Sequence, residues 1–225
     1  MGIRRFVRAL PFVGRIAKRP ATAKAAVFST SGAYWEQRYR TGGHSGAGSY
    51  NRLGLFKADV LNGFVAANQI RSVIEFGSGD GAQLRLALYP SYTGVDVSHT
   101  VLERTRAAFA HDPSIRFLHA SEVGPDTKAD LALSLDVIYH LVEDDIYDAY
   151  MRQLFDAALR FVIVYASNED KGWPVPHVRH RRFTDWVERH RPDFALVERL
   201  PNRYPYDPAD ARNTSFADFF VFRRA

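Results

Sequence analysis

The chain has 225 residues, of which 46% are hydrophobic and 24% charged, and its net charge is +5 with a pI near 9.5. This composition is typical of one soluble globular domain and excludes the disordered and membrane-embedded classes. The sequence contains no cysteine, which excludes disulfide frameworks and thiolate metal sites and agrees with a cytoplasmic location.

We interpret residues 1–30 as a basic extension. Its bases have no acid among them and alternate with apolar side chains. Such a segment can form an amphipathic helix on anionic lipid or nucleic acid, or remain a partly disordered extension, and both readings stay open. Pro11 and Pro20 interrupt the apolar stretch, which is short for a secretion signal.

Residues 31–225 are expected to form one domain in which helices and strands alternate. Apolar residues at helical spacing predict a helix over 53–69, and a Val- and Ile-containing run predicts a buried strand over 73–77. Similar patterns predict helices at 82–88, 99–110 and 146–158, and strands at 92–97, 115–119, 129–135 and 161–166. Strands joined by helices imply parallel crossovers and therefore a doubly wound α/β sheet.

The last part of the chain departs from this alternation. After a predicted helix over 183–190, residues 195–200 and 217–222 both have the pattern of strands. They are joined by a segment rich in Pro, Asn, Asp and Tyr without helical periodicity, which suits an antiparallel return.

A glycine-rich turn follows the strand over 73–77, with the sequence Glu75-Phe-Gly77-Ser-Gly79-Asp-Gly81. Glycines allow main-chain N–H groups to approach a ligand closely. The glycines also satisfy the pattern of dinucleotide sites, and Asp96 lies about 20 residues further on, as in those sites. The glycines alone therefore do not choose between cofactors.

Three features favour one alternative: Glu75 two residues before the first glycine, the tight G-x-G-x-G spacing, and the fourth strand with its continuation, Leu133 to His140. Together they resemble the class I S-adenosylmethionine-dependent methyltransferases, from about Tyr34 to the C-terminus. The resemblance implies a Rossmann-like, seven-stranded, mostly parallel sheet with an antiparallel last strand in three α/β/α layers.

The resemblance also implies S-adenosylmethionine as cofactor and a set of cofactor-binding residues. The turn would pack against the methionine part, Glu75 would orient the amino group, and Asp96 would accept both ribose hydroxyls. Ser121 or Glu122 would meet the adenine. The full predicted set is Glu75, Gly77, Gly79, Gly81, Asp96, Val97, Ser121 and Asp136. Asp136 would act through its main chain, and the alternative that it holds a divalent cation stays open; no metal ligands are assigned.

His140 is the predicted general base. It lies just beyond the fourth strand, and ligands in open α/β sheets bind outside the carboxyl ends of the strands. Histidine also has an ordinary pKa that suits proton removal near neutral pH. The alternative is a histidine at a helix start that is bonded to a backbone carbonyl.

Two segments are expected to contact the acceptor. Residues 31–52 would form a cover with a glycine-rich loop over 42–49, and Tyr34 and Tyr50 are its predicted binding residues. After the fifth strand, Trp173 offers a flat face for a sugar ring, and His177 and His180 could bond hydroxyls or share a metal on one helical face. Alternatively, this segment is a solvated helix start and Trp173 closes the rim of the core.

Within the family, the sequence looks most like small bacterial methyltransferases of sugar and polysaccharide synthesis. We therefore expect O-methylation of a hydroxyl on a saccharide or another small molecule. The alternative is a nucleic-acid-associated methyltransferase or cofactor-binding protein that uses the basic extension. Against it, Asp136-Val-Ile-Tyr139 lacks the Pro-Pro-Tyr motif that base-methylating relatives carry. Peripheral membrane contact through the extension and the oligomeric state stay open.

Overall fold

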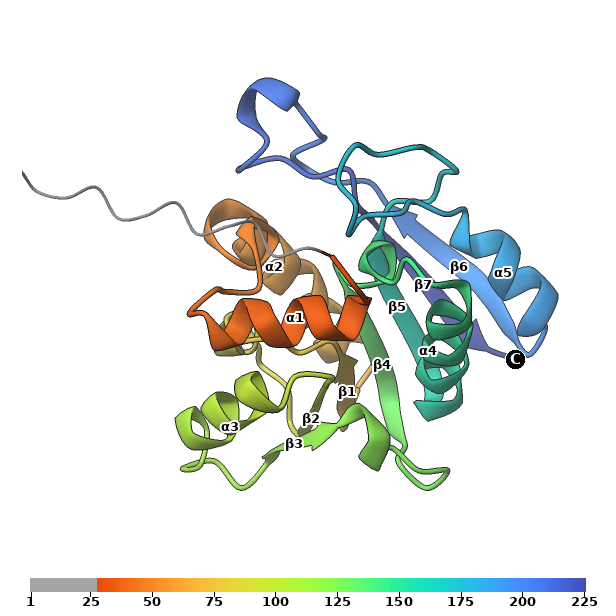
Figure 1. The fold of residues 1–225 in the computed structure, drawn as a ribbon. Coiled ribbons are helices and arrows are strands. Elements are labelled where there is room, and N and C mark those ends of the chain that lie inside the picture. Colours follow the sequence, from red (N-terminus) through yellow and green to blue (C-terminus); the bar gives the residue numbers. More distant parts are fainter. Residues whose placement is uncertain (1–27) are drawn as a thin grey trace, which may run out of the picture.

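A computed structural model describes residues 28–225 of the chain. The expected basic helix falls on residues 1–27 and so lies outside the described residues. A central sheet carries helices on both of its faces (Figure 1). None of the described helices has the length and apolar character needed to cross a membrane.

The sheet has seven strands in the order β3-β2-β1-β4-β5-β7-β6. Strands β1 to β5 run parallel to one another, whereas β7 runs antiparallel to both of its neighbours, β5 and β6. The predicted α/β fold class is therefore confirmed, including the antiparallel last strand. The strands are β1 (Val73–Phe76), β2 (Tyr92–Asp96), β3 (Ile115–His119), β4 (Ala129–Leu135), β5 (Ala158–Ala166), β6 (Phe194–Leu200) and β7 (Asp218–Arg224).

Five α-helices are described: α1 (Ser31–Arg40), α2 (Asn51–Ala67), α3 (His99–Ala108), α4 (Asp144–Ala157) and α5 (Phe183–His190). Short 3-10 turns complete the connections: η1 (Ala47–Ser49), η2 (Leu84–Leu86), η3 (Ala120–Glu122), η4 (Ile138–His140) and η5 (Pro208–Asp210).

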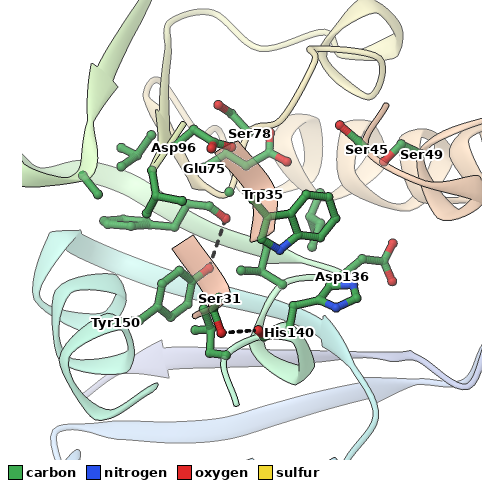
Figure 2. A pocket seen from close by; sticks show the side chains of 18 of the residues that line it. Ser31, Trp35, Ser45, Ser49, Glu75, Ser78, Asp96, Asp136, His140 and Tyr150 are labelled. Carbon is green, nitrogen blue, oxygen red and sulfur yellow. Dashed lines mark hydrogen bonds between the residues drawn. The ribbon is translucent and has the colours of Figure 1, made fainter. Parts of the chain in front are cut away.

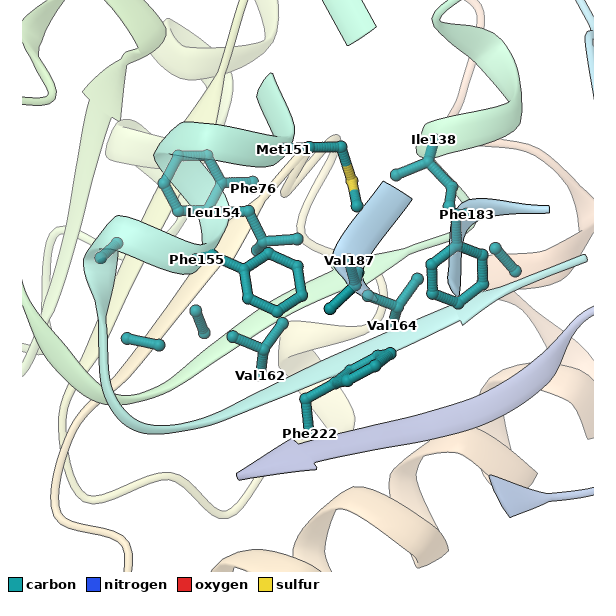
Figure 3. Packing of buried hydrophobic residues seen from close by; sticks show 14 of the residues in the cluster. Phe76, Ile138, Met151, Leu154, Phe155, Val162, Val164, Phe183, Val187 and Phe222 are labelled. Carbon is teal, nitrogen blue, oxygen red and sulfur yellow. The ribbon is translucent and has the colours of Figure 1, made fainter. Parts of the chain in front are cut away.

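The two-residue alternation of the strands divides the core into two hydrophobic layers. In β1, Ile74 and Phe76 pack with α4 and α5, while Val73 packs on the opposite face with α2 and α3. Figure 3 shows the first layer, where Leu154 and Phe155 of α4 meet Phe222 of β7 and the strands beneath them. This arrangement gives the three α/β/α layers.

The predicted helix over 82–88 is wrong in extent, because only the single 3-10 turn η2 forms there. Ala87 is already extended, and Pro90 disfavours a helical conformation in the residue before it. Only one turn therefore fits between Gly81 and β2. Elsewhere the expected elements form with ends displaced by no more than three residues, and the helix α1 is additional to them.

The strand order reverses direction at β1, where β2 and β3 lie on one side and β4 on the other. Open α/β sheets bind ligands outside the carboxyl ends of their strands at such a reversal. In Figure 1, α1 lies across this end of β1, β2 and β4.

Candidate active site

A pocket lies at the carboxyl ends of β1, β2 and β4, below α1 (Figure 2). The glycine turn and β1 supply one wall, and the segment after β4 supplies another. Trp35 and Tyr39 of α1 contribute to its cover. The pocket thus brings together residues that lie more than 100 positions apart in the chain.

The glycine turn is shaped by close packing. Gly77 has a φ of 80°, and a Cβ there would collide with the Val137 side chain. Gly79 has a φ of 55°, and a Cβ there would collide with Ser45 Oγ of the cover loop. These positions require glycine because both the left-handed conformation and the lack of space exclude larger residues. Of the turn, Gly77, Ser78 and Asp80 line the pocket.

Two buried carboxyl groups stand on either side of this turn. Tyr92 OH donates to Glu75 Oε2 at 2.7 Å, and Gly79 N donates to Asp96 Oδ2 at 2.9 Å. Burial raises the pKa of Glu75 to about 7, although the Tyr92 hydrogen bond and the charge of Lys57 oppose that rise. Burial also raises the pKa of Asp96, against the effect of backbone N–H groups that favour its carboxylate. Both acids line the pocket.

Asp136 directly follows β4, has a φ of 61° and lines the same pocket. Its Oδ2 accepts from Lys57 Nζ at 2.7 Å, and its Oδ1 accepts from Tyr139 OH at 2.8 Å. The Lys57 side chain is only 1% exposed. Since the nearest charge to this carboxylate is an ammonium group, Asp136 is engaged in an ion pair. Among residues 28–225, no group of three or more His, Cys, Asp or Glu is arranged to hold a metal ion.

His140 lines the pocket next to Trp35, whose ring centroid lies 5.1 Å from that of the imidazole (Figure 2). His140 Nδ1 lies 2.9 Å from the carbonyl oxygen of His177. A carbonyl only accepts, so Nδ1 donates and Nε2 of the neutral ring keeps its lone pair. Burial lowers the pKa of His140 to about 4, and the bond to the carbonyl offsets this only in part. The imidazole is therefore neutral at pH 7.

The cover is fastened to the domain at three places. Glu36 of α1 accepts from Ser98 Oγ at 2.6 Å and from Thr100 Oγ1 at 2.5 Å. Ser31 Oγ, at the start of α1, donates to Glu143 and also lies within bonding distance of the His140 carbonyl.

The third fastening ties the cover loop to the glycine turn. Asp80 Oδ2 accepts from Ser45 N at 2.9 Å and from Tyr50 OH at 2.6 Å, while Asp80 N donates to Ser45 Oγ at 2.9 Å. The cover therefore closes the pocket through contacts made by α1 and by the loop behind it.

The remaining predicted residues are placed at different distances from the pocket. Val97 lines it, whereas Ser121 does not and instead bonds His119 Nδ1; its neighbour Ala120 takes the lining position. Tyr50 holds the rim through Asp80. Gly79 and Gly81 shape the turn without lining the pocket.

The segment after β5 divides into two parts. His177 lies beside the site: its ring stacks on Tyr34 with centroids 4.3 Å apart, and its carbonyl holds His140. Trp173 and His180 do not line the pocket but pack together with Phe216, and Ser167 Oγ lies 2.6 Å from His180 Nδ1.

The expected helical face for His177 and His180 does not form. The helix α5 begins only at Phe183, and residues 177–180 lie in a loop.

Sequence reasoning missed Lys57. A signal for it was present, because Lys57 is four residues from both Leu53 and Leu61 and so lies on the buried stripe of α2. A lysine on an apolar stripe requires a buried partner. Two further pocket residues were also missed: Ser78 and Gln83 are buried, and Ser78 Oγ and Gln83 Oε1 have no hydrogen-bond partner among the described residues.

The sequence of residues 74–161 matches the model of a family described as a methyltransferase domain. This region contains the glycine turn and the ends of β1, β2 and β4 that build the pocket. A comparison with curated proteins finds no match.

Solved structures of methyltransferases share the fold of this chain. The N-methyltransferase NodS from Bradyrhizobium japonicum WM9, in complex with S-adenosyl-L-homocysteine, is 14% identical with a TM-score of 0.66 over 87% of this chain and 99% of that one. Magnesium protoporphyrin IX methyltransferase from Synechocystis PCC 6803 is 15% identical with a TM-score of 0.62, covering 86% and 97%. The methyltransferase domain of bacterial CtHen1 is 22% identical with a TM-score of 0.58, covering 75% and 97%.

S-adenosylmethionine is the cofactor that fits this domain. Glu75 offers a buried acceptor suited to an ammonium group, and Asp96 offers a carboxylate within the same pocket. Ser78 Oγ and Gln83 Oε1, which have no hydrogen-bond partner among the described residues, can also bond polar groups of the cofactor there.

Proposed function

We propose that the protein is an S-adenosylmethionine-dependent methyltransferase that methylates a hydroxyl of a sugar or another small molecule, with His140 as general base. The observation that carries this proposal is the state of the imidazole. Its Nδ1–H donates to a carbonyl, its Nε2 lone pair is available, and the ring lines the pocket in its neutral form. A hydroxyl acceptor needs such a base because its proton must leave as the new bond forms.

The proposed cofactor site uses residues from three strand ends. When bound, S-adenosylmethionine supplies an activated methyl group on a sulfonium. Gly77 lies against its methionine part, while Gly79 and Gly81 shape the turn. Glu75 accepts from its amino group, and Asp96 accepts from its ribose hydroxyls.

The adenine end of the proposed site is assigned to Val97, whose side chain lines the pocket, and Asp136 is assigned to the methyl-transfer end. Ser121 stays outside the lining, so Ala120 takes the adenine contact expected of that segment.

The cover supports a small acceptor. The contacts of Glu36, Ser31 and Asp80 hold α1 and its loop over the site, which excludes water from the reacting atoms. Among the acceptor contacts first expected, His177 lies beside His140 and Tyr34 stacks on His177, and both remain in the proposal. Tyr50 is assigned to closing the cover, and Trp173 and His180 to supporting the loop that carries His177.

The structural neighbours do not identify the acceptor of this protein. One is named an N-methyltransferase and another acts on magnesium protoporphyrin IX, so the assignment to a hydroxyl rests on His140. A nucleic-acid acceptor would use the basic extension, of which residues 1–27 lie outside the described residues.

The test is methyl transfer from labelled S-adenosylmethionine to a panel of saccharides, with and without chelator, followed by location of the methyl in the product. His140→Ala should lose 10²- to 10⁴-fold in turnover and keep its affinity for S-adenosyl-L-homocysteine. His111→Ala, a change at an exposed histidine, is the matched control and should retain full activity. Full turnover by His140→Ala would show that His140 is not the base.

A further inference from the structure

Arg38 is a positively charged side chain that lies over the pocket-lining Trp35 and that the proposed reaction does not use. It lies on α1, three residues after Trp35. Its guanidinium carbon lies 5.6 Å from the centroid of the Trp35 ring, and that ring is in edge contact with His140. Trp35 therefore contacts both Arg38 and the proposed base.

The position of Arg38 is fixed, but its binding capacity is largely unused. Arg38 Nε donates to the His44 carbonyl at 2.7 Å, and a Cβ on Gly43 would collide with the Arg38 side chain. Among residues 28–225, the two terminal nitrogens of this guanidinium have neither a hydrogen-bond acceptor nor a carboxylate partner. A guanidinium carries five donors in a planar fork, so most of its donors remain available.

Among residues 28–225, no carboxylate forms an ion pair with Arg38, and the acids that hold the cover or line the pocket have other hydrogen-bond partners. Glu36 accepts from Ser98 and Thr100, Asp80 from Ser45 and Tyr50, Asp136 from Lys57 and Tyr139, and Glu143 from Ser31. The charge of Arg38 also acts on the two histidines at the site. After burial, which is the larger cause, the positive charge of Arg38 contributes to lowering the pKa of both His140 and His177.

We propose that Arg38 binds an anionic group of the acceptor, so that the substrate is a small hydroxyl compound carrying a phosphate or a carboxylate. This inference rests on the proposed function and names the class of its acceptor. A phosphate or carboxylate matches the planar fork of a guanidinium and can form two parallel hydrogen bonds with it. The anion would sit at the rim while the hydroxyl reaches past Trp35 to His140.

Binding of the anion has a second effect on the site. It neutralises the charge that opposes protonation of His140, so the imidazole becomes a better proton acceptor when the acceptor is in place. A neutral analogue would bind without this change. Arg38 thus acts as a specificity-determining residue.

The test uses three matched probes with the full chain saturated in S-adenosyl-L-homocysteine: glucose 1-phosphate, glucuronate and glucose, titrated by calorimetry. At least one anionic probe should bind roughly tenfold or more tightly than glucose, and added salt should weaken that preference. Comparison of the two anions distinguishes phosphate from carboxylate. Arg38→Gln should abolish the preference, whereas Arg40→Gln, a change at an exposed arginine on the same helix, should keep it.

Equal affinity for all three probes, or a preference that survives in Arg38→Gln, would overturn the inference. The pKa of the His177 imidazole, followed by NMR, gives a second readout. It should rise when the anionic probe binds to the native chain and stay constant in Arg38→Gln. Failure of S-adenosyl-L-homocysteine to bind would instead refute the proposed function, so the two failures are distinguishable.

Discussion

Glu75 should make cofactor binding depend on pH in the neutral range. Its carboxyl group is buried, and its pKa is raised to about 7, mainly by that burial. The amino group of S-adenosyl-L-homocysteine is a cation at pH 7, because the pKa of such an amino group lies above 7. A cation beside Glu75 favours the carboxylate, so binding releases the proton that the carboxyl group carries in the free protein.

The magnitude follows from the fraction of Glu75 that is ionised before binding. With a pKa of about 7, about one eleventh is ionised at pH 6 and about one half at pH 7. The dissociation constant should therefore fall about fivefold between these two pH values, which corresponds to about 1 kcal/mol. His140 does not titrate in this window, because its pKa is about 4.

The assay is calorimetric titration of S-adenosyl-L-homocysteine at pH 6.0, 6.5 and 7.0 in buffers of different ionisation enthalpy, which also counts the released protons. Glu75→Gln keeps the size of the side chain and can still accept from Tyr92, but it cannot ionise. This variant should bind more weakly at pH 7 and show a flat profile. Glu103→Gln, a change at an exposed position, should reproduce the native slope.

Either of two results would refute this reasoning. A native profile that is flat between pH 6 and pH 7 would mean that no buried carboxyl group loses a proton on binding. A slope that persists in Glu75→Gln would assign the proton to another group, such as Asp96, whose pKa burial also raises.

Three further predictions concern stability and closure. Folding favours the neutral form of His140, so the stability that this form contributes is present above pH 6.5 and is lost as the pH falls toward 4. Between pH 7 and pH 4.5, the free energy of unfolding in urea should therefore fall by roughly 2 kcal/mol more for the native chain than for His140→Gln. Asp80→Asn weakens the hydrogen bonds that hold the cover loop, so S-adenosyl-L-homocysteine should dissociate roughly tenfold faster in stopped flow. An unchanged rate would show that the loop does not control release of the ligand. Lys57→Met leaves the Asp136 carboxylate without its cation and should lower the free energy of unfolding by roughly 3 to 5 kcal/mol, whereas adding Asp136→Asn should recover most of this loss; no recovery would mean that the ion pair is not the cause.

The strands and the glycine turn could be predicted because their signals are local. The apolar run at Val73–Phe76, the glycines after it and the acid at Asp96 follow one another at intervals that depend only on strand length and turn geometry. Since parallel strands end at the same edge of a sheet, this order in the chain was enough to bring Glu75, Asp96 and His140 into one pocket.

The partners of those residues depended on the tertiary structure. His140 receives its tautomer from the His177 carbonyl 37 residues away, and Lys57 meets Asp136 across 79 residues. No periodicity or residue spacing in the sequence signals either contact, because each forms where segments distant in the chain pack together. Trp173 illustrates the same limit. Its flat aromatic ring suited a sugar-binding face, but in the structure it packs against Phe216 and His180 and does not line the pocket. Sequence alone determined which strand ends meet, and the folded chain decided which side chains they meet with.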